Sequence, residues 1–134
     1  MKARRNITVL IADDSVVLRE RLLEMLGDIS GVEILGCAQD GLQTIDRIRQ
    51  LKPEVVVLDI QMPRGTGLDV LKNIKHDRGG PIVIVFTNFP YPQYRKRALE
   101  IGADYFFDKT TEFEKLRGLF QELTSAAKPE AQPH

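Results

Sequence analysis

Short apolar runs alternate along the chain with segments whose apolar residues recur every three or four positions. Most of the runs are rich in β-branched residues and are bounded by turn or charged residues, a pattern that predicts strands. The runs are Ile7–Ala12, Val32–Ala38, Val55–Leu58, Ile82–Phe86 and Tyr105–Phe107. Because most of them show no polar alternation, we predict strands that are covered on both faces, as in a parallel sheet between two helical layers.

An amphipathic segment follows each predicted strand. The first helix is expected to start after Ser15, a predicted N-cap, and the second to stop before Pro53. The third is closed by residues 79–81 (Gly-Gly-Pro), and the fourth, about residues 93–101, ends at Gly102. This alternation predicts a (βα)5 chain, and right-handed crossovers give a doubly wound α/β fold. We therefore predict a flavodoxin-like three-layer sandwich with a parallel sheet in the order 2-1-3-4-5.

Polar side chains stand directly after four of the predicted strands. They are Asp13 and Asp14, Asp59, Thr87, and Asp108 with Lys109. In the predicted order these four strands are contiguous, and ligands of open α/β sheets bind at the carboxyl ends of the strands. Any one of the aspartates could simply cap a helix. Chemically active residues at all four strand ends instead indicate one shared site.

The chemistry of that site is restricted by charge. Carboxylates about 4 Å apart repel by several kcal/mol at an effective dielectric near 20, so raised pKa values or a cation must compensate. Hard oxygen ligands in small number suit Mg²⁺, which keeps several waters and binds phosphate oxygens. Lys109 adds a positive charge and Thr87 a hydroxyl donor. Together these groups are the parts that phosphoryl transfer requires.

Four motifs carry a resemblance to a known family. They are Asp13-Asp14-Ser15, residues 57–63 (Val-Leu-Asp-Ile-Gln-Met-Pro), Phe86-Thr87 and Lys109. Their residues and spacing resemble the response-regulator receiver domains of two-component systems, typified by the bacterial chemotaxis response regulator. The resemblance covers about residues 6–124, which we expect to form one receiver domain. Residues 125–134 are expected to be a flexible tail or the start of a linker.

The resemblance implies roles for the acidic residues. Asp59 is implied to be the phosphoacceptor. Asp14, Asp59 and the backbone carbonyl of Gln61 are implied to ligate Mg²⁺ directly, while Asp13 acts mainly through a metal-bound water.

The resemblance also implies a switch. Thr87 and Lys109 are expected to bind phosphoryl oxygens, and Phe106 fills the position of the family's switch aromatic. Phosphorylation would draw Thr87 inward, let Phe106 take the vacated space, and reshape the face formed by the fourth helix, the last strand and the last helix. The sequence departs from the family at Thr110, where proline is usual, and at Asn88, where a small residue is common.

The implied function is that of a phosphoacceptor in a phosphorelay. The partners are a sensor histidine kinase or a histidine phosphotransfer protein, and a downstream protein target. A homodimer through the reshaped face is a hypothesis from the resemblance. No enzymatic activity is expected beyond self-catalysed phosphotransfer to Asp59 and autodephosphorylation.

Composition argues against several other classes of protein. Lys plus Arg and Asp plus Glu number 19 each, which argues against direct nucleic acid binding by bulk charge. No apolar run approaches the roughly 20 residues of a membrane helix, and no signal peptide is evident. Cys37 stands alone, so no internal disulfide forms. A cytoplasmic location is the default expectation.

Two rival functions are weighed against this one. Phosphatases of the haloacid dehalogenase class expect a second acid two residues after the nucleophile, where this chain has Gln61. The stronger alternative is a receiver-like module that binds partners without being phosphorylated. Such domains usually lose a site residue, and none is missing here. Asn88 and Phe106, however, leave the switch unproven, so the alternative stays open.

Overall fold

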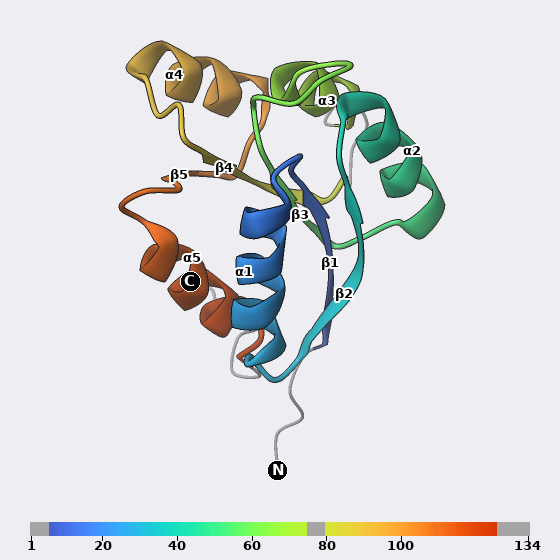
Figure 1. Cartoon of the computed structure of the whole chain (residues 1–134), viewed down its shortest axis with the longest axis vertical. Helices are drawn as coiled ribbons and strands as arrows, with labels where there is room; N and C mark the ends of the chain where they lie inside the picture. The colour runs from blue at the N-terminus through green and yellow to red at the C-terminus, as the bar shows by residue number, and fades with distance from the viewer. Residues whose placement is uncertain (1–5, 75–79, 126–134) are drawn as a thin grey trace, which may run out of the picture.

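The computed structural model describes residues 6–74 and 80–125, and strand and helix alternate throughout (Figure 1). The strands are β1 (Ile7–Ala12), β2 (Val32–Ala38), β3 (Val55–Leu58), β4 (Ile82–Thr87) and β5 (Tyr105–Asp108). The helices are α1 (Val16–Gly27), α2 (Gly41–Leu51), α3 (Gly67–Ile74), α4 (Pro92–Ile101) and α5 (Phe113–Leu123). Residue 79 of the predicted turn and residues 126–134 of the predicted tail lie outside the described residues.

All strand pairs are parallel, and the sheet order is β2-β1-β3-β4-β5, which confirms the predicted flavodoxin-like arrangement. Two strands run one residue further than predicted. The reason is that Thr87 pairs with Asp108 in the β4–β5 ladder, although neither residue is apolar. The extension places both polar residues at the carboxyl edge of the sheet.

The sheet separates two apolar cores. Helices α1 and α5 cover one face, and α2, α3 and α4 cover the other (Figure 1). Alternate residues of each inner strand point to opposite cores: in β1, Val9 and Ile11 join the first, while Leu10 and Ala12 join the second. Burial on both faces is why the strands show no polar alternation.

Local sequence signals fix most helix ends. Ser15 caps α1, because its Oγ accepts a hydrogen bond from the backbone N–H of Leu18 at 3.2 Å. Lys52, directly before Pro53, adopts a left-handed conformation (φ 50°) after α2. Gly102 closes α4 with φ 135°, a value that glycine adopts without strain. These ends confirm the predicted cap and stop signals.

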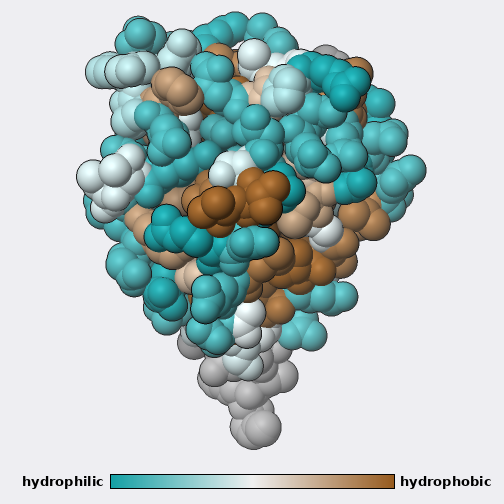
Figure 2. Space-filling model, viewed as in Figure 1, coloured by the Kyte–Doolittle hydropathy of each residue, from teal (hydrophilic) through white to brown (hydrophobic). Residues whose placement is uncertain are grey.

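Some apolar surface is left outside both cores. Figure 2 shows it as brown areas, including one over the start of α1, where Val16 and Val17 are 56% and 68% exposed. Within the described ranges, no helix combines the length and apolar character needed to cross a membrane.

Candidate functional site

Three carboxylates meet at the carboxyl ends of the central strands. Asp13 and Asp14 follow β1, and Asp59 follows β3. One carboxylate oxygen from each lies within 4.8 Å of the others. Asp13 and Asp59 are buried, while Asp14 is exposed. The structure therefore brings together three of the four acidic residues that follow the predicted strands, whereas the carboxylate of Asp108 accepts from the N–H of Thr110 instead.

Backbone hydrogen bonds hold these residues in place. The N–H of Asp59 donates to the carbonyl of Ala12 at 3.0 Å, so the β1–β3 pairing continues to the site. The carboxylate of Asp13 accepts from the N–H of Ser15 at 2.8 Å, and that of Asp59 accepts from the N–H of Gln61 at 3.3 Å. Each buried carboxylate thus has a fixed orientation.

Lys109 supplies a positive charge between the two buried acids. Its Nζ lies 2.6 Å from Oδ2 of Asp13 and 3.2 Å from Oδ2 of Asp59, and the side chain is 8% exposed. Its backbone N–H donates to the carbonyl of Thr87 at 2.9 Å. Because buried charges need partners, this arrangement compensates part of the charge of the acids.

The clustered groups of the site carry a net negative charge that a bound cation would balance. Burial raises the pKa of Asp59 to about 6; Lys109 opposes this shift and Asp13 adds to it. Three carboxylates minus one ammonium leave two negative charges among the clustered groups. Oxygen donors with this excess charge fit one Mg²⁺ ion, which would favour the charged form of Asp59.

Thr87 and Gln61 are also placed near the predicted site. Thr87 ends β4 with its side chain fully buried, and its Oγ1 accepts from the N–H of Phe89 at 3.0 Å. Gln61 is exposed in the loop after β3. Beside Lys109, a hollow of about 360 Å³ is lined in part by Asn88 and Thr110, the two departures noted in the sequence. The ligand and switch roles of these residues remain predictions.

Phe106 is buried under α4. Its side chain is 4% exposed and belongs to the core under α2, α3 and α4. The guanidinium of Arg95 lies 5.5 Å from the centre of the Phe106 ring, and its Nη1 donates to the carbonyl of Phe106 at 3.3 Å. Arg95 therefore connects α4 with the predicted switch position. Sequence analysis did not find it, because no local signal distinguishes it from the basic residues beside it.

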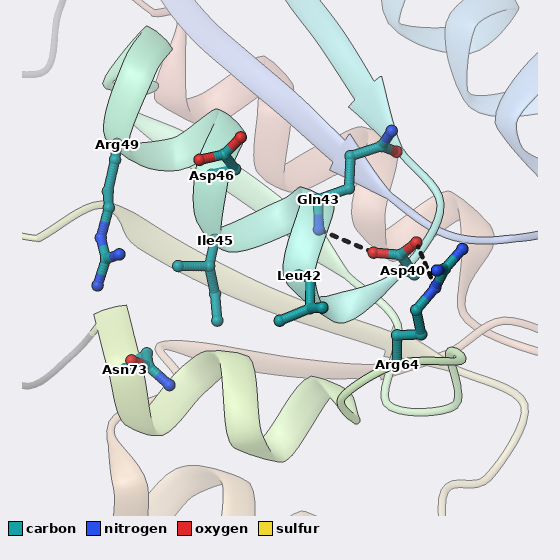
Figure 3. Close-up of a pocket in the computed structure, with 8 residues that line it drawn as sticks. All are labelled: Asp40, Leu42, Gln43, Ile45, Asp46, Arg49, Arg64 and Asn73. Carbon is teal, nitrogen blue, oxygen red and sulfur yellow. Dashed lines mark hydrogen bonds and ion pairs between the residues drawn. The ribbon is translucent and has the colours of Figure 1, made fainter.

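The loop after β3 is fastened to the start of α2. Figure 3 shows Asp40, whose carboxylate accepts from the N–H of Gln43 at 2.8 Å and pairs with Nε of Arg64 at 3.3 Å. The N–H of Gly41 donates to the carbonyl of Pro63 at 3.0 Å. A Cβ on Gly41 would lie 2.2 Å from the carbonyl oxygen of Gly65, so only glycine allows this close approach.

The same figure shows a surface hollow between α2 and α3. Its volume is about 730 Å³. The lining residues are Asp40, Leu42, Gln43, Ile45, Asp46, Arg49, Arg64 and Asn73. None of these is a predicted site residue, so we assign the chemistry to the acidic cluster and not to this hollow.

Comparison with known proteins agrees with the fold. Residues 9–121 match the response regulator receiver domain, and the chain belongs to this family. It is therefore a receiver domain of two-component systems, a family of phosphoacceptor switches. This confirms the family that the four motifs indicated.

Individual relatives differ in total length. The chain is 38% identical over 119 residues to the protein-glutamate methylesterase/protein-glutamine glutaminase 1 of Methanospirillum hungatei, which covers 87% of this chain and 35% of that protein. The chain thus spans about a third of this relative's length. The structure resembles the response regulator domain of Thermotoga maritima CheB with a TM-score of 0.79 and 27% identity, covering 93% of this chain and 100% of that one.

A third similarity is to a complex that contains BeF3 and Mg²⁺. It is the CheX-CheY-BeF3-Mg²⁺ complex from Borrelia burgdorferi, matched with a TM-score of 0.75 and 27% identity over 87% of this chain and 90% of that chain.

Proposed function

We propose that Asp59 is the phosphoacceptor of this receiver domain, and that it takes a phosphoryl group from a phosphohistidine on a sensor histidine kinase or a histidine phosphotransfer protein. The observation that carries the proposal is the buried Asp59 carboxylate, flanked by Asp13 and by the Lys109 ammonium at 3.2 Å. We take the domain to be residues 6–124, which includes the matched residues 9–121.

The proposed transfer is a substitution at phosphorus. A carboxylate oxygen of Asp59 attacks the phosphorus, the bond to the histidine nitrogen breaks, and the electron pair of that bond stays on the imidazole. The product is an acyl phosphate on Asp59. Lys109 is already directed at the Asp59 carboxylate and would pair with one phosphoryl oxygen, and the Thr87 hydroxyl would bind another.

The proposed metal ligands are Asp13 through a water, Asp14, Asp59 and the backbone carbonyl of Gln61. Bound Mg²⁺ would neutralise charge shared by the carboxylates and the phosphoryl oxygens. The carboxylate cluster and the Mg²⁺-containing complex of the Borrelia burgdorferi relative support this assignment.

The proposed response involves α4, β5 and α5. Thr87 and Phe106 would shift together on phosphorylation and change how this face binds a downstream protein, or a second copy of the chain. Lys109, the residue after β5, links that strand to Asp59, and Arg95 links α4 to Phe106. The alternative of a phosphorylation-independent module is not favoured, because no predicted site residue is missing, and the three clustered aspartates, Thr87 and Lys109 all stand at the carboxyl ends of their strands.

Intact mass spectrometry after incubation with acetyl phosphate tests the proposal. We expect wild type to gain one phosphoryl group with Mg²⁺ and none with a chelator. Asp59→Asn should gain none, while Asp46→Asn, which makes the same change on an exposed residue of α2, should behave like wild type. If folded wild type gains no phosphoryl group under any of these conditions, the proposed function is wrong.

A further inference from the structure

The end of β5 has an unusual arrangement of backbone hydrogen bonds. β5 is an edge strand, with β4 as its neighbour (Figure 1). Successive N–H groups of a strand point to opposite sides, and that of Lys109 points to β4, where it donates to Thr87. The N–H of Asp108 must therefore point away from β4, to the side where the described sheet has no further strand. It needs an acceptor from elsewhere.

Glu112 supplies that acceptor. Its Oε1 accepts from the N–H of Asp108 at 2.8 Å, and its own N–H donates to the carbonyl of Asp108 at 2.9 Å. The carboxylate of Asp108 in turn accepts from the N–H of Thr110 at 2.8 Å. Lys109 thus lies within a short loop whose two ends are tied to each other by reciprocal hydrogen bonds.

Both carboxylates of this loop are charged at neutral pH. The hydrogen bond from the Thr110 N–H lowers the pKa of Asp108 below its usual value. The bond from the Asp108 N–H, together with the Lys115 ammonium at 3.0 Å, lowers the pKa of Glu112. Charged acceptors form the stronger hydrogen bonds, so the loop is well fixed.

The position of this loop decides where the Lys109 ammonium lies. Lysine has a flexible four-carbon stem, and the buried Nζ of Lys109 lies at contact distance from two carboxylates. A movement of its backbone by a fraction of an ångström would change both distances. Charge stabilisation in phosphoryl transfer depends on such positioning, so the effect would reach the reaction at Asp59.

We propose that Glu112 is a positioning residue for the phosphoryl transfer, and that it acts through Lys109 by accepting the Asp108 N–H and fixing the β5–α5 loop. The inference rests on the proposed function of Asp59. The inference gives a role in the transfer to a residue that does not itself touch the reacting groups.

The test compares Glu112→Asp with Glu112→Gln. Aspartate keeps the charge but is one methylene shorter, so it should not reach the Asp108 N–H; it is also favoured at helix starts, so the variant should fold. Glutamine keeps an oxygen acceptor at full length. Glu114→Asp is the matched control, since Glu114 also begins α5 and also forms an i,i+3 ion pair, with Arg117.

The readout is the rate of phosphorylation by acetyl phosphate at saturating Mg²⁺, with thermal unfolding as a check of folding. We expect Glu112→Asp to reduce the rate about 10-fold. Glu112→Gln should remain within about 3-fold of wild type, and Glu114→Asp should be unchanged. In a Lys109→Ala background, Glu112→Asp should cause no further reduction, because its effect passes through Lys109.

A wild-type rate for Glu112→Asp would overturn the inference, as would an equal reduction with and without Lys109. If wild type itself is not phosphorylated, the proposed function fails separately. The positioning of Lys109 by Glu112 is then decided by NMR: Glu112→Asp should speed the solvent exchange of the Lys109 ammonium protons, and Glu114→Asp should not. Unchanged exchange in Glu112→Asp would reject it.

Discussion

Two corners of the molecule carry site residues into helices, and they are built differently. The β1–α1 corner carries Asp13 and Asp14 and continues into a helix with a side-chain cap from Ser15. Arg19 adds a further tie, since its Nη1 donates to the carbonyl of Asp13 at 2.8 Å. The helix then buries four residues, Leu18, Leu22, Met25 and Leu26.

The β4–α4 corner carries Thr87 and continues into α4, a helix with no side-chain cap and few buried residues. Tyr91 precedes α4 without a side-chain capping bond, and the helix buries only Ala98. Phe89 and Tyr91 are exposed, and their rings pack on each other with centres 6.3 Å apart. The Tyr91 ring therefore packs against its own loop.

The difference shows how a small domain can combine chemistry with movement. Acidic residues must keep their spacing, and they stand on the corner with more buried contacts. The helix next to Phe106 has little apolar area to lose, so a shift of α4 costs less than a shift of α1.

The largest expected effect is a difference between α1 and α4 in the free energy of unfolding that is lost when a buried side chain is shortened. Leu22 is fully buried in α1, and Leu22→Ala should reduce the free energy of unfolding by about 3 kcal/mol. Ala98→Gly, at the one buried position of α4, should reduce it by about 1 kcal/mol, mainly through helix propensity. Urea unfolding followed by circular dichroism measures both. Equal losses would remove the distinction between the corners.

A second effect concerns Asp59, which follows β3 and lies beside the acidic residues of the β1–α1 corner. Because burial raises the pKa of Asp59 to about 6, the folded state binds a proton that the unfolded chain has already released. The stability of Mg²⁺-free wild type should therefore fall as pH rises from about 4 to about 6, relative to Asp59→Asn.

At pH 7.5 and without Mg²⁺, we expect Asp59→Asn to be more stable than wild type by about 3 kcal/mol, and the difference to fall below about 1 kcal/mol near pH 4. Added Mg²⁺ should stabilise wild type and reduce this difference, because the ion binds the folded carboxylates. Urea unfolding over this pH range, with Mg²⁺ and with chelator, measures it. A difference that does not vary with pH would contradict the raised pKa.

The smallest effect concerns the two helix starts. Ser15→Ala removes the capping bond to Leu18 and should reduce the free energy of unfolding by about 1 kcal/mol. Tyr91→Ala removes no capping bond and should change it by less than about 0.5 kcal/mol. The same urea titration compares them, and a larger loss for Tyr91→Ala would show that the aromatic contacts hold α4 in place.

Local signals explain why much of the fold could be predicted. Runs such as Val55–Leu58 are buried on both faces, so the apolar pattern gives the strand bounds directly. Ser15 and Gly102 act within one helical turn and were predicted correctly. The acidic residues could be brought together because parallel strands end at a common edge.

Contacts between distant side chains could not be predicted in this way. The bond from Arg95 to Phe106 and the bond from Asp108 to Glu112 depend on how a helix or loop sits against β5. Neither residue type nor spacing marks these pairs, because an Arg or Glu near a helix start can form many different contacts. The ends of β4 and β5 were missed by one residue because polar residues continued the ladder.

The central strand β3 shows a further consequence of burial on both faces. Its sequence is Val-Val-Val-Leu, so a slip of one residue would exchange branched apolar side chains between the two cores without exposing a polar one. Apolar burial alone therefore discriminates poorly between neighbouring alignments of this strand. The slip would, however, move Asp59 by about 3.3 Å along the strand, away from the carbonyl of Ala12 and from Lys109. The residues proposed to serve phosphorylation thus also help to select the correct strand alignment during folding.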